Sequence, residues 1–333
     1  MKKLFFFVFL FAIVSATQLN LTMDSLGRWR LPLTARLVET GTDVDARVFL
    51  DFHGLHDFLY RPRRNETSVA LDIADSLFIG DNTTGRTCIA SGNFSIPIVS
   101  DLGLWNTMEA SIGVGFGSAF GHGFERFIIT PSGERGSGLL VLDPSTPEQY
   151  AYGGQWFYVN SLCDQTPIIE ASVVVGDDTA SSPARFYLTS NSYLTLIPAE
   201  AFQNIVGYLE RAGFNIVDDS THEDQSGEVP TRVRRVNLGP FVTLYFSRIS
   251  VSQLAQILPP IHLEIVSGTQ RFRITIFPED YIGATGREYY LSISGVSGHD
   301  GAYTLGTNVL RHLAVQIDYE NYQIGFAEPL AEF

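Results

Sequence analysis

The chain is poor in cysteine, in charged side chains and in long apolar runs, and each shortage excludes a class of protein. Its 333 residues hold only two cysteines, Cys88 and Cys163, too few for a disulfide-dense scaffold. Charged residues make up 17%, and the 36 acidic residues outnumber the 22 Lys and Arg, so we expect neither nucleic acid nor an anionic membrane surface as a partner. Beyond residue 16, no stretch reaches the ~18 apolar residues of a membrane span.

The same scarcity bears on metals, cofactors and disulfides. No Cys/His array has the spacing of a zinc site, so we expect no metal and no cofactor. In an oxidising compartment, Cys88 and Cys163 either pair and close a long loop or stay buried and free. Spacing alone does not decide between these two alternatives, because it does not give the distance between the cysteines.

Apolar residues are abundant. Hydrophobic residues account for 45% of the chain and aromatic residues for 12%, which is typical of a large buried core and excludes disorder. A length of 333 residues is enough for two packed domains. We therefore expect a globular protein with two domains.

The first residues predict export. Lys2 and Lys3 precede a short apolar segment at 4–14, and small residues follow it, so we expect residues 1–16 to be a cleaved signal peptide. Four Asn-x-Ser/Thr sequons then lie within the first hundred residues, and we expect them to be glycosylated on exposed loops. They begin at Asn20, Asn65, Asn82 and Asn93. These features predict a secreted glycoprotein, located outside the cell or in a lumen of the secretory or lysosome-like pathway.

Short strands dominate the expected secondary structure. Several segments are rich in β-branched and aromatic residues and are bounded by turn formers. They are 46–50, 127–130, 137–142, 170–175, 185–188, 242–246, 262–266 and 272–276. One helix is expected at 198–212, where apolar residues recur at helical spacing, and a second short one begins near Asn308. We expect an exposed loop at 218–230, where the sequence is acidic and rich in turn formers. The fold class is therefore all-β with a few short helices.

A two-fold echo runs through the chain. One strand leads to Asp51 and on to Leu59, and another leads to Thr189 and on to Leu194. A Gly-containing apolar turn follows later in each half, at 112–115 and at 305–306. This repetition predicts two related lobes.

Motifs in the second half are long and specific. Leu258-Pro-Pro-Ile-His-Leu-Glu-Ile265 is similar to the pattern "LPxIxFxI", with Leu263 in place of its Phe. Thr304-Leu-Gly-Thr-Asn-Val-Leu-Arg311, followed by Val315-Gln-Ile-Asp-Tyr-Glu-Asn-Tyr-Gln-Ile-Gly-Phe-Ala327, is close to "ILGDxFLRxxYxxFDxxNxxIGFA". Both segments resemble the pepsin-like aspartic protease family.

Segments upstream fit the same resemblance. Gly41-Thr42 with Val48-Phe-Leu-Asp51 is similar to the approach to the family's first aspartate, and Ser111-Ile-Gly-Val-Gly-Phe116 to its "DGILGLG" turn. Gly138-Leu-Leu-Val-Leu-Asp143 is similar to its strands that cross between the lobes. The resemblance covers roughly residues 30–330 and implies a bilobal fold with a central cleft. It implies an N-terminal β lobe at 17–145, shortened and without a clear flap hairpin, and a C-terminal β lobe at 146–333.

The chemistry of that family needs two facing carboxylates, each in an Asp-Thr-Gly turn, which share one proton and hold a water molecule. Here the first turn keeps Asp51, but Phe52 and His53 replace its hydroxyl residue and its glycine. In the second turn Thr189 takes the place of the catalytic aspartate. Because a threonine hydroxyl cannot share a proton with Asp51 as a second carboxylate would, the resemblance implies a broken catalytic pair.

Ser190 and Asn191 follow Thr189 in the second turn and complete the candidate cleft residues. Asp51 is either a surviving catalytic group or a structural remnant bonded to turn amides. His53 and His56 could be imagined as metal ligands, but in a strand-loop segment their spacing does not bring the rings together. Ser190 as a nucleophile lacks an orienting third group and an oxyanion hole in the sequence.

Two functions remain open. The first is a non-catalytic pseudoprotease that binds a peptide or protein ligand in the inter-lobe cleft, and the sequence does not separate it from a purely structural coat or matrix glycoprotein. The alternative is a divergent aspartic endopeptidase that uses Asp51 with another carboxylate. A carboxyl group facing Asp51 would favour the enzyme, and Thr189 there favours the binding protein.

Overall fold

The protein is described from a computed structural model and consists mainly of β-strands. The described residues are 17–24, 28–37, 43–52, 59–61, 71–79, 87–97, 109–118, 124–132, 136–190, 192–218, 232–238, 240–247, 249–285, 288–297 and 303–330. The all-β class expected from the sequence is confirmed. No described helix combines the length and the apolar character that crossing a bilayer would require.

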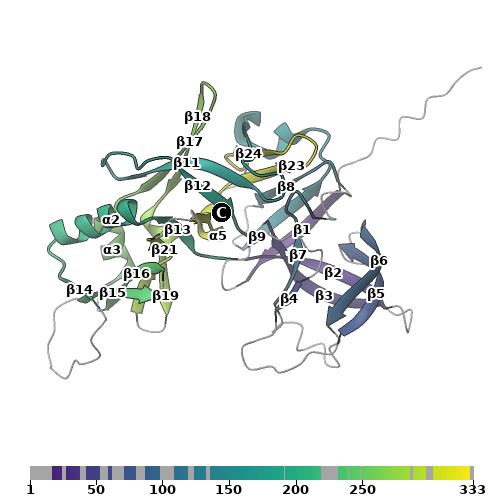
Figure 1. The fold of residues 1–333 in the computed structure, drawn as a ribbon, viewed down its shortest axis with the longest axis horizontal. Coiled ribbons are helices and arrows are strands. Elements are labelled where there is room, and N and C mark those ends of the chain that lie inside the picture. Colours follow the sequence, from purple (N-terminus) through teal and green to yellow (C-terminus); the bar gives the residue numbers. More distant parts are fainter. Residues whose placement is uncertain are drawn as a thin grey trace, which may run out of the picture.

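Half of the described strands form one twelve-stranded sheet, which lies on the right of Figure 1. Its path runs β10 (Phe157–Asn160), β24 (Gln323–Ala327), β23 (Ala314–Asp318), β8 (Arg126–Pro131), β9 (Ser137–Leu142), β1 (Thr17–Met23), β2 (Trp29–Leu37), β3 (Asp43–Asp51), β7 (Glu109–Gly113) and β4 (Leu59–Arg61). The hairpin of β5 (Leu71–Ile79) and β6 (Thr87–Pro97) joins it through β2. Three of these strands, β10, β23 and β24, come from beyond residue 145, so the first sheet is completed by the second half of the chain.

A second twelve-stranded sheet holds the other strands, on the left of Figure 1. Its path runs β14 (Ile216–Asp218), β15 (Arg232–Leu238), β16 (Phe241–Ser247), β21 (Ile293–Val296), β13 (Thr195–Pro198), β22 (Tyr303–Leu305), β12 (Ala184–Leu188), β11 (Ile168–Val175), β17 (Ile261–Ser267) and β18 (Gln270–Ile276). β19 (Ile282–Thr285) and β20 (Glu288–Leu291) join through β16. All eight strands predicted from the sequence are present within these two sheets.

Within the described ranges, helices are short and few. The predicted helix at 198–212 is α2 (Ala199–Arg211), whose apolar face is buried and after which Gly213 takes a positive φ of 86°. The predicted short helix is α5 (Thr307–Leu310). The others are α3 (Val251–Ile257), α4 (Pro278–Tyr281) and the 3₁₀ turns η2 (Pro147–Tyr150) and η3 (Tyr152–Gly154). Ser250 caps α3 by accepting a hydrogen bond from the Gln253 amide.

One four-strand arrangement occurs in both sheets. In the first sheet β3 is antiparallel to β2 and parallel to β7, and β7 is antiparallel to β4. In the second, β12 is antiparallel to β11 and parallel to β22, and β22 is antiparallel to β13. The order and directions are identical, so the two-fold echo in the sequence corresponds to a repeated topology.

A continuous hydrophobic core contains side chains from both sheets. Phe157 of β10 stacks on Phe272 of β18 with ring centroids 5.4 Å apart, and Phe272 in turn stacks on Phe326 of β24. The aromatic content of the sequence is therefore used partly to join the two sheets. Asp318, at the end of β23, is buried and accepts hydrogen bonds from the amide and side chain of Asn321, which fixes the β23–β24 turn.

Two sequons lie in strands, not in the loops that we expected. Asn20 belongs to β1, where its side chain is exposed, and Asn93 belongs to β6. Asn65, Asn82, the predicted signal peptide and most of the predicted acidic loop lie outside the described residues. Whether the sequons carry glycans stays a prediction.

Candidate functional site

The first predicted turn leaves the sheet at the end of β3. Asp51 is the last residue of that strand and is 4% exposed. Its carbonyl oxygen accepts a hydrogen bond from the Val114 amide at 2.9 Å, which extends the parallel pairing with β7 by one residue. The backbone of Asp51 is therefore held by the sheet itself, and its side chain is placed in a buried position.

The second predicted turn leaves its sheet in the same way. Leu188 ends β12 opposite Leu305 of β22, and the Thr189 amide donates to the Leu305 carbonyl at 3.0 Å. Thr189 is 7% exposed. Thr189 thus occupies, in the second repeat, the position that Asp51 occupies in the first.

Ser190 joins the two turns across a separation of 138 residues. Its Oγ accepts a hydrogen bond from the Phe52 amide at 3.1 Å and donates one to the Leu50 carbonyl. Ser190 is fully buried, so both backbone groups of the first turn depend on a protein partner rather than on water. The structure therefore brings together four residues that the sequence predicted as one site: Asp51, Phe52, Thr189 and Ser190.

The bridge formed by the Ser190 hydroxyl has no counterpart from the equivalent side chain of the first turn. Phe52 follows Asp51 as Ser190 follows Thr189, but its side chain is a buried ring that stacks on Phe127 at 6.0 Å. A phenyl ring has no donor or acceptor with which to return the hydrogen bonds that Ser190 makes. Phe52 instead contributes hydrophobic packing beneath the first turn.

A cluster of buried polar side chains lies next to the second turn. Thr195 Oγ1 donates to Asn308 Oδ1 at 2.6 Å and accepts from the Gly306 amide at 3.0 Å. Asn308 Nδ2 donates to both the carbonyl and the hydroxyl of Ser292, each at 3.1 Å. Thr195, Ser292 and Asn308 are fully buried, so this cluster is satisfied internally and connects β13, α5 and the residue between β20 and β21.

Gly306 is required at this point by a close approach of two backbones. A Cβ atom there would lie 2.4 Å from the Leu194 carbonyl oxygen. The Thr307 amide also donates to the Ser192 carbonyl at 2.8 Å. The start of α5 is therefore packed directly against the loop that follows Thr189.

The sequence did not reveal this supporting cluster. The sequence indicates Asn308 only as the start of a short helix, and no pattern in it distinguishes Thr195 or Ser292. The available signal was a polar residue directly before the apolar pair Val309–Leu310, because a polar side chain next to buried residues needs an internal partner.

Several predicted residues lie outside the described part of the chain. These are His53, His56 and Asn191. Among the described residues, no group of three or more His, Cys, Asp or Glu side chains is placed to hold a metal ion. Neither turn, over 50–52 and 188–190, contains a carboxyl group other than Asp51.

Cys163 lies on a turn between β10 and β11 as a free, partly exposed thiol. Burial raises its pKa, but hydrogen bonds from the amides of Gln165 and Thr166 outweigh that effect, and the pKa lies below its ordinary value. The side chain of Cys88, in β6, lies outside the described residues.

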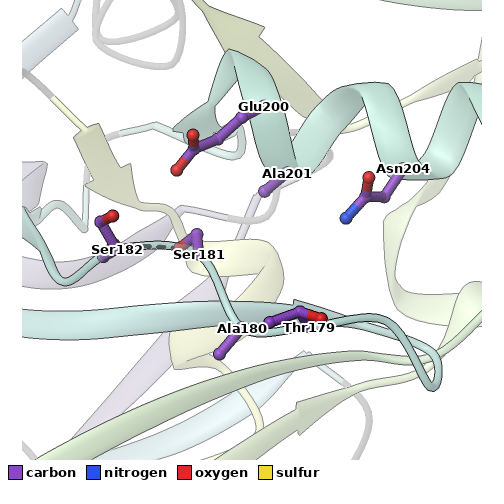
Figure 2. Close-up of a pocket in the computed structure, with 7 residues that line it drawn as sticks. All are labelled: Thr179, Ala180, Ser181, Ser182, Glu200, Ala201 and Asn204. Atoms are coloured by element: carbon purple, nitrogen blue, oxygen red, sulfur yellow. Dashed lines mark hydrogen bonds between the residues drawn. The ribbon is translucent and has the colours of Figure 1, made fainter.

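A small polar hollow lies away from the paired turns, between the first turns of α2 and the segment 179–182. Figure 2 shows Glu200 and Asn204 on the helix, with Ser181 and Ser182 on the facing segment. Its volume is about 250 Å³. Glu200 and Ser182 are exposed, and Ser181 bonds to its own neighbouring backbone, so the hollow lacks a buried polar group directed at a ligand.

Comparison of the sequence with models of known protein families finds no match, and comparison with curated proteins finds none either.

Proposed function

We propose that the chain is a secreted, bilobal, pepsin-like glycoprotein that has lost proteolysis and binds a peptide or protein ligand between its lobes. The observation that carries the proposal is the bridge from Ser190 to the backbone on both sides of Asp51. It supports the alignment of Thr189 with the second catalytic aspartate of the family that the sequence resembles. The repeated four-strand topology supports the two related lobes.

Loss of catalysis follows from the composition of the two turns. Two carboxylates about 3 Å apart share a proton because they cannot both ionise, and that shared proton lets one act as base and the other as acid. Thr189 supplies no carboxyl group, and Phe52 supplies no hydroxyl to hold the pair. Asp51 is then a buried remnant whose backbone position is kept by β7.

A cleavage assay tests this half of the proposal. The full chain, produced through a secretory pathway, is incubated with denatured protein substrate at acidic pH, with and without pepstatin. We expect no turnover and no tight pepstatin binding. Pepstatin-sensitive turnover that disappears in Asp51→Asn but persists in the exposed control Asp164→Asn would revive the alternative, a divergent aspartic endopeptidase.

Ligand binding needs a separate measurement. A mixture of apolar peptides with photo-crosslinking groups is irradiated with the protein, and the adducts are mapped by mass spectrometry. We expect adducts on the segments that flank residues 50–52 and 188–190. Adducts found only on the outer faces of the two sheets would contradict a ligand between the lobes.

A further inference from the structure

A trough of about 740 Å³ lies on another part of the molecule, between β18 and the chain that follows β24. None of its lining residues belongs to the two turns at Asp51 and Thr189. Three of its side chains are large, apolar and exposed: Tyr152 (66%), Phe277 (56%) and Leu330 (61%). Large apolar side chains gathered around one hollow, rather than scattered singly, mark a contact surface for another molecule.

One wall of the trough is the open edge of a sheet. β18 is the last strand in the order of the second sheet, and Phe272–Thr275 line the trough consecutively. β18 pairs with β17 along one side only, and within the described ranges its backbone makes no hydrogen bond on the other side. In an antiparallel ladder, alternate residues direct N–H and C=O groups outward, so this edge can accept a further strand.

The side chains of β18 define the chemistry of such a strand. Arg271 and Arg273 share one face, and Phe272 lies on the other. Arg273 forms an ion pair with Glu264 of β17, whereas Arg271 stands opposite Val266. Arg271 is exposed, and it takes part in none of the ion pairs formed by the described residues. An added strand with acidic side chains on the Arg face would supply the missing opposite charge.

A second copy of this chain is the less suitable occupant. Antiparallel pairing of two β18 strands would place Arg271 and Arg273 of one copy beside the same residues of the other. Like charges facing each other across strands are destabilising. An acidic partner avoids that repulsion and still contacts the exposed apolar side chains of the trough, although Asp280 and Glu328 also line it.

We propose that the open edge of β18 and the adjoining trough bind an extended segment of a partner protein in which acidic and apolar side chains alternate. The partner's backbone pairs with the outer edge of β18. Its acidic side chains face Arg271 and Arg273, and its apolar side chains face Phe272 and the Leu330 side of the trough. Backbone hydrogen bonds supply the pairing, and the alternating side chains supply the selectivity.

Fluorescence anisotropy of the full chain tests the proposal. The peptide used is a short fluorescein-labelled sequence in which glutamate alternates with leucine. We expect saturable binding at low salt, weakened about fivefold by Arg271→Glu and about fivefold by Leu330→Ala. Both residues are exposed, so neither substitution removes core packing. Leu162→Ala, at a leucine that is 49% exposed and outside the trough, is the matched control and should leave the dissociation constant unchanged.

Two modified peptides separate strand addition from simple adsorption. Replacing glutamate by lysine should abolish binding, and methylating the backbone nitrogens that face β18 should also abolish it. Equal binding of the N-methylated peptide would overturn the proposal, as would the absence of saturable binding by the unmodified one. In that case Arg271 and Arg273 serve only to keep an exposed edge from pairing.

Two further outcomes are informative. A dimer seen by analytical ultracentrifugation and lost in Thr275→Pro would assign the edge to a second copy and overturn the proposal. Asp51→Asn and Ser190→Ala should not alter affinity for the acidic peptide. The proposed ligand between the lobes and the proposed partner at β18 therefore succeed or fail separately.

Discussion

The Ser190 hydroxyl provides the sharpest test of how the two turns are joined. Ser190→Ala removes one oxygen but keeps the Cβ atom, so packing around the site changes little. The Phe52 amide and the Leu50 carbonyl then lose their partner in a position that water does not reach. Each buried backbone group left unsatisfied costs about 1–3 kcal/mol. For the two groups together we therefore expect a loss of about 2–6 kcal/mol in the free energy of unfolding.

The measurement is urea unfolding followed by tryptophan fluorescence, with Ser192→Ala as the matched control. Ser192 lies in the same loop and is partly exposed. Among the described residues, its Oγ accepts a hydrogen bond only from the Leu194 amide, at 3.2 Å. Its replacement should cost about 0.5–1 kcal/mol, because water can take over the hydrogen bond. If Ser190→Ala loses no more stability than Ser192→Ala, the bridge does not hold the two turns together in solution, and the reasoning is refuted.

Two further predictions concern other parts of the fold. Burial raises the pKa of Asp280, but hydrogen bonds from His312 and the Phe277 amide, and the charges of His312 and Arg311, outweigh it and lower the pKa below 3.8. The ionised carboxylate therefore stabilises the folded state above pH 3.8, and this contribution is lost as the pH falls through the folded pKa. The difference in unfolding free energy between the wild type and Asp280→Asn should shrink over that pH range. A difference that stays constant from neutral pH downward would contradict the assignment. Gly306→Ala should destabilise the protein by about 3 kcal/mol, because the new Cβ would lie 2.4 Å from a backbone oxygen. Gly207→Ala, on α2, is the control. A shift in the unfolding midpoint no larger than that of the control would show that the loop moves to accommodate the new Cβ atom.

Strand positions were predictable because they depend on local chemistry. β9 (Ser137–Leu142) and β12 (Ala184–Leu188) combine apolar, β-branched or aromatic residues with clear turn formers at their ends, and the predicted bounds agree to within a residue. α2 was predictable for the same reason, since its buried residues recur at helical spacing.

Other strands were missed because their pattern is weak. β1 (Thr17–Met23) follows the predicted signal peptide, and nothing in its residue pattern indicates that it lies between β9 and β2 in the first sheet. β5 and β6 alternate polar and apolar residues irregularly, and their pairing contains register shifts. Such strands are set by the partners they meet, which lie far away in the sequence.

The candidate site was likewise predictable in part from the sequence. The family resemblance of the motifs selected Asp51, Phe52, Thr189 and Ser190, which stand at the ends of two expected strands in matching places of the two halves. It also established that the second turn lacks a carboxyl group, since composition is a property of the sequence.

Only the tertiary structure decided which groups touch. That Ser190 reaches across 138 residues to the first turn, that Asn308 is buried against Thr195, and that β18 is left as an open edge all depend on how the sheets are assembled. Local patterns encode which residues form strands and which faces are apolar. Hydrogen bonds and open edges between distant segments arise only when those faces are packed together.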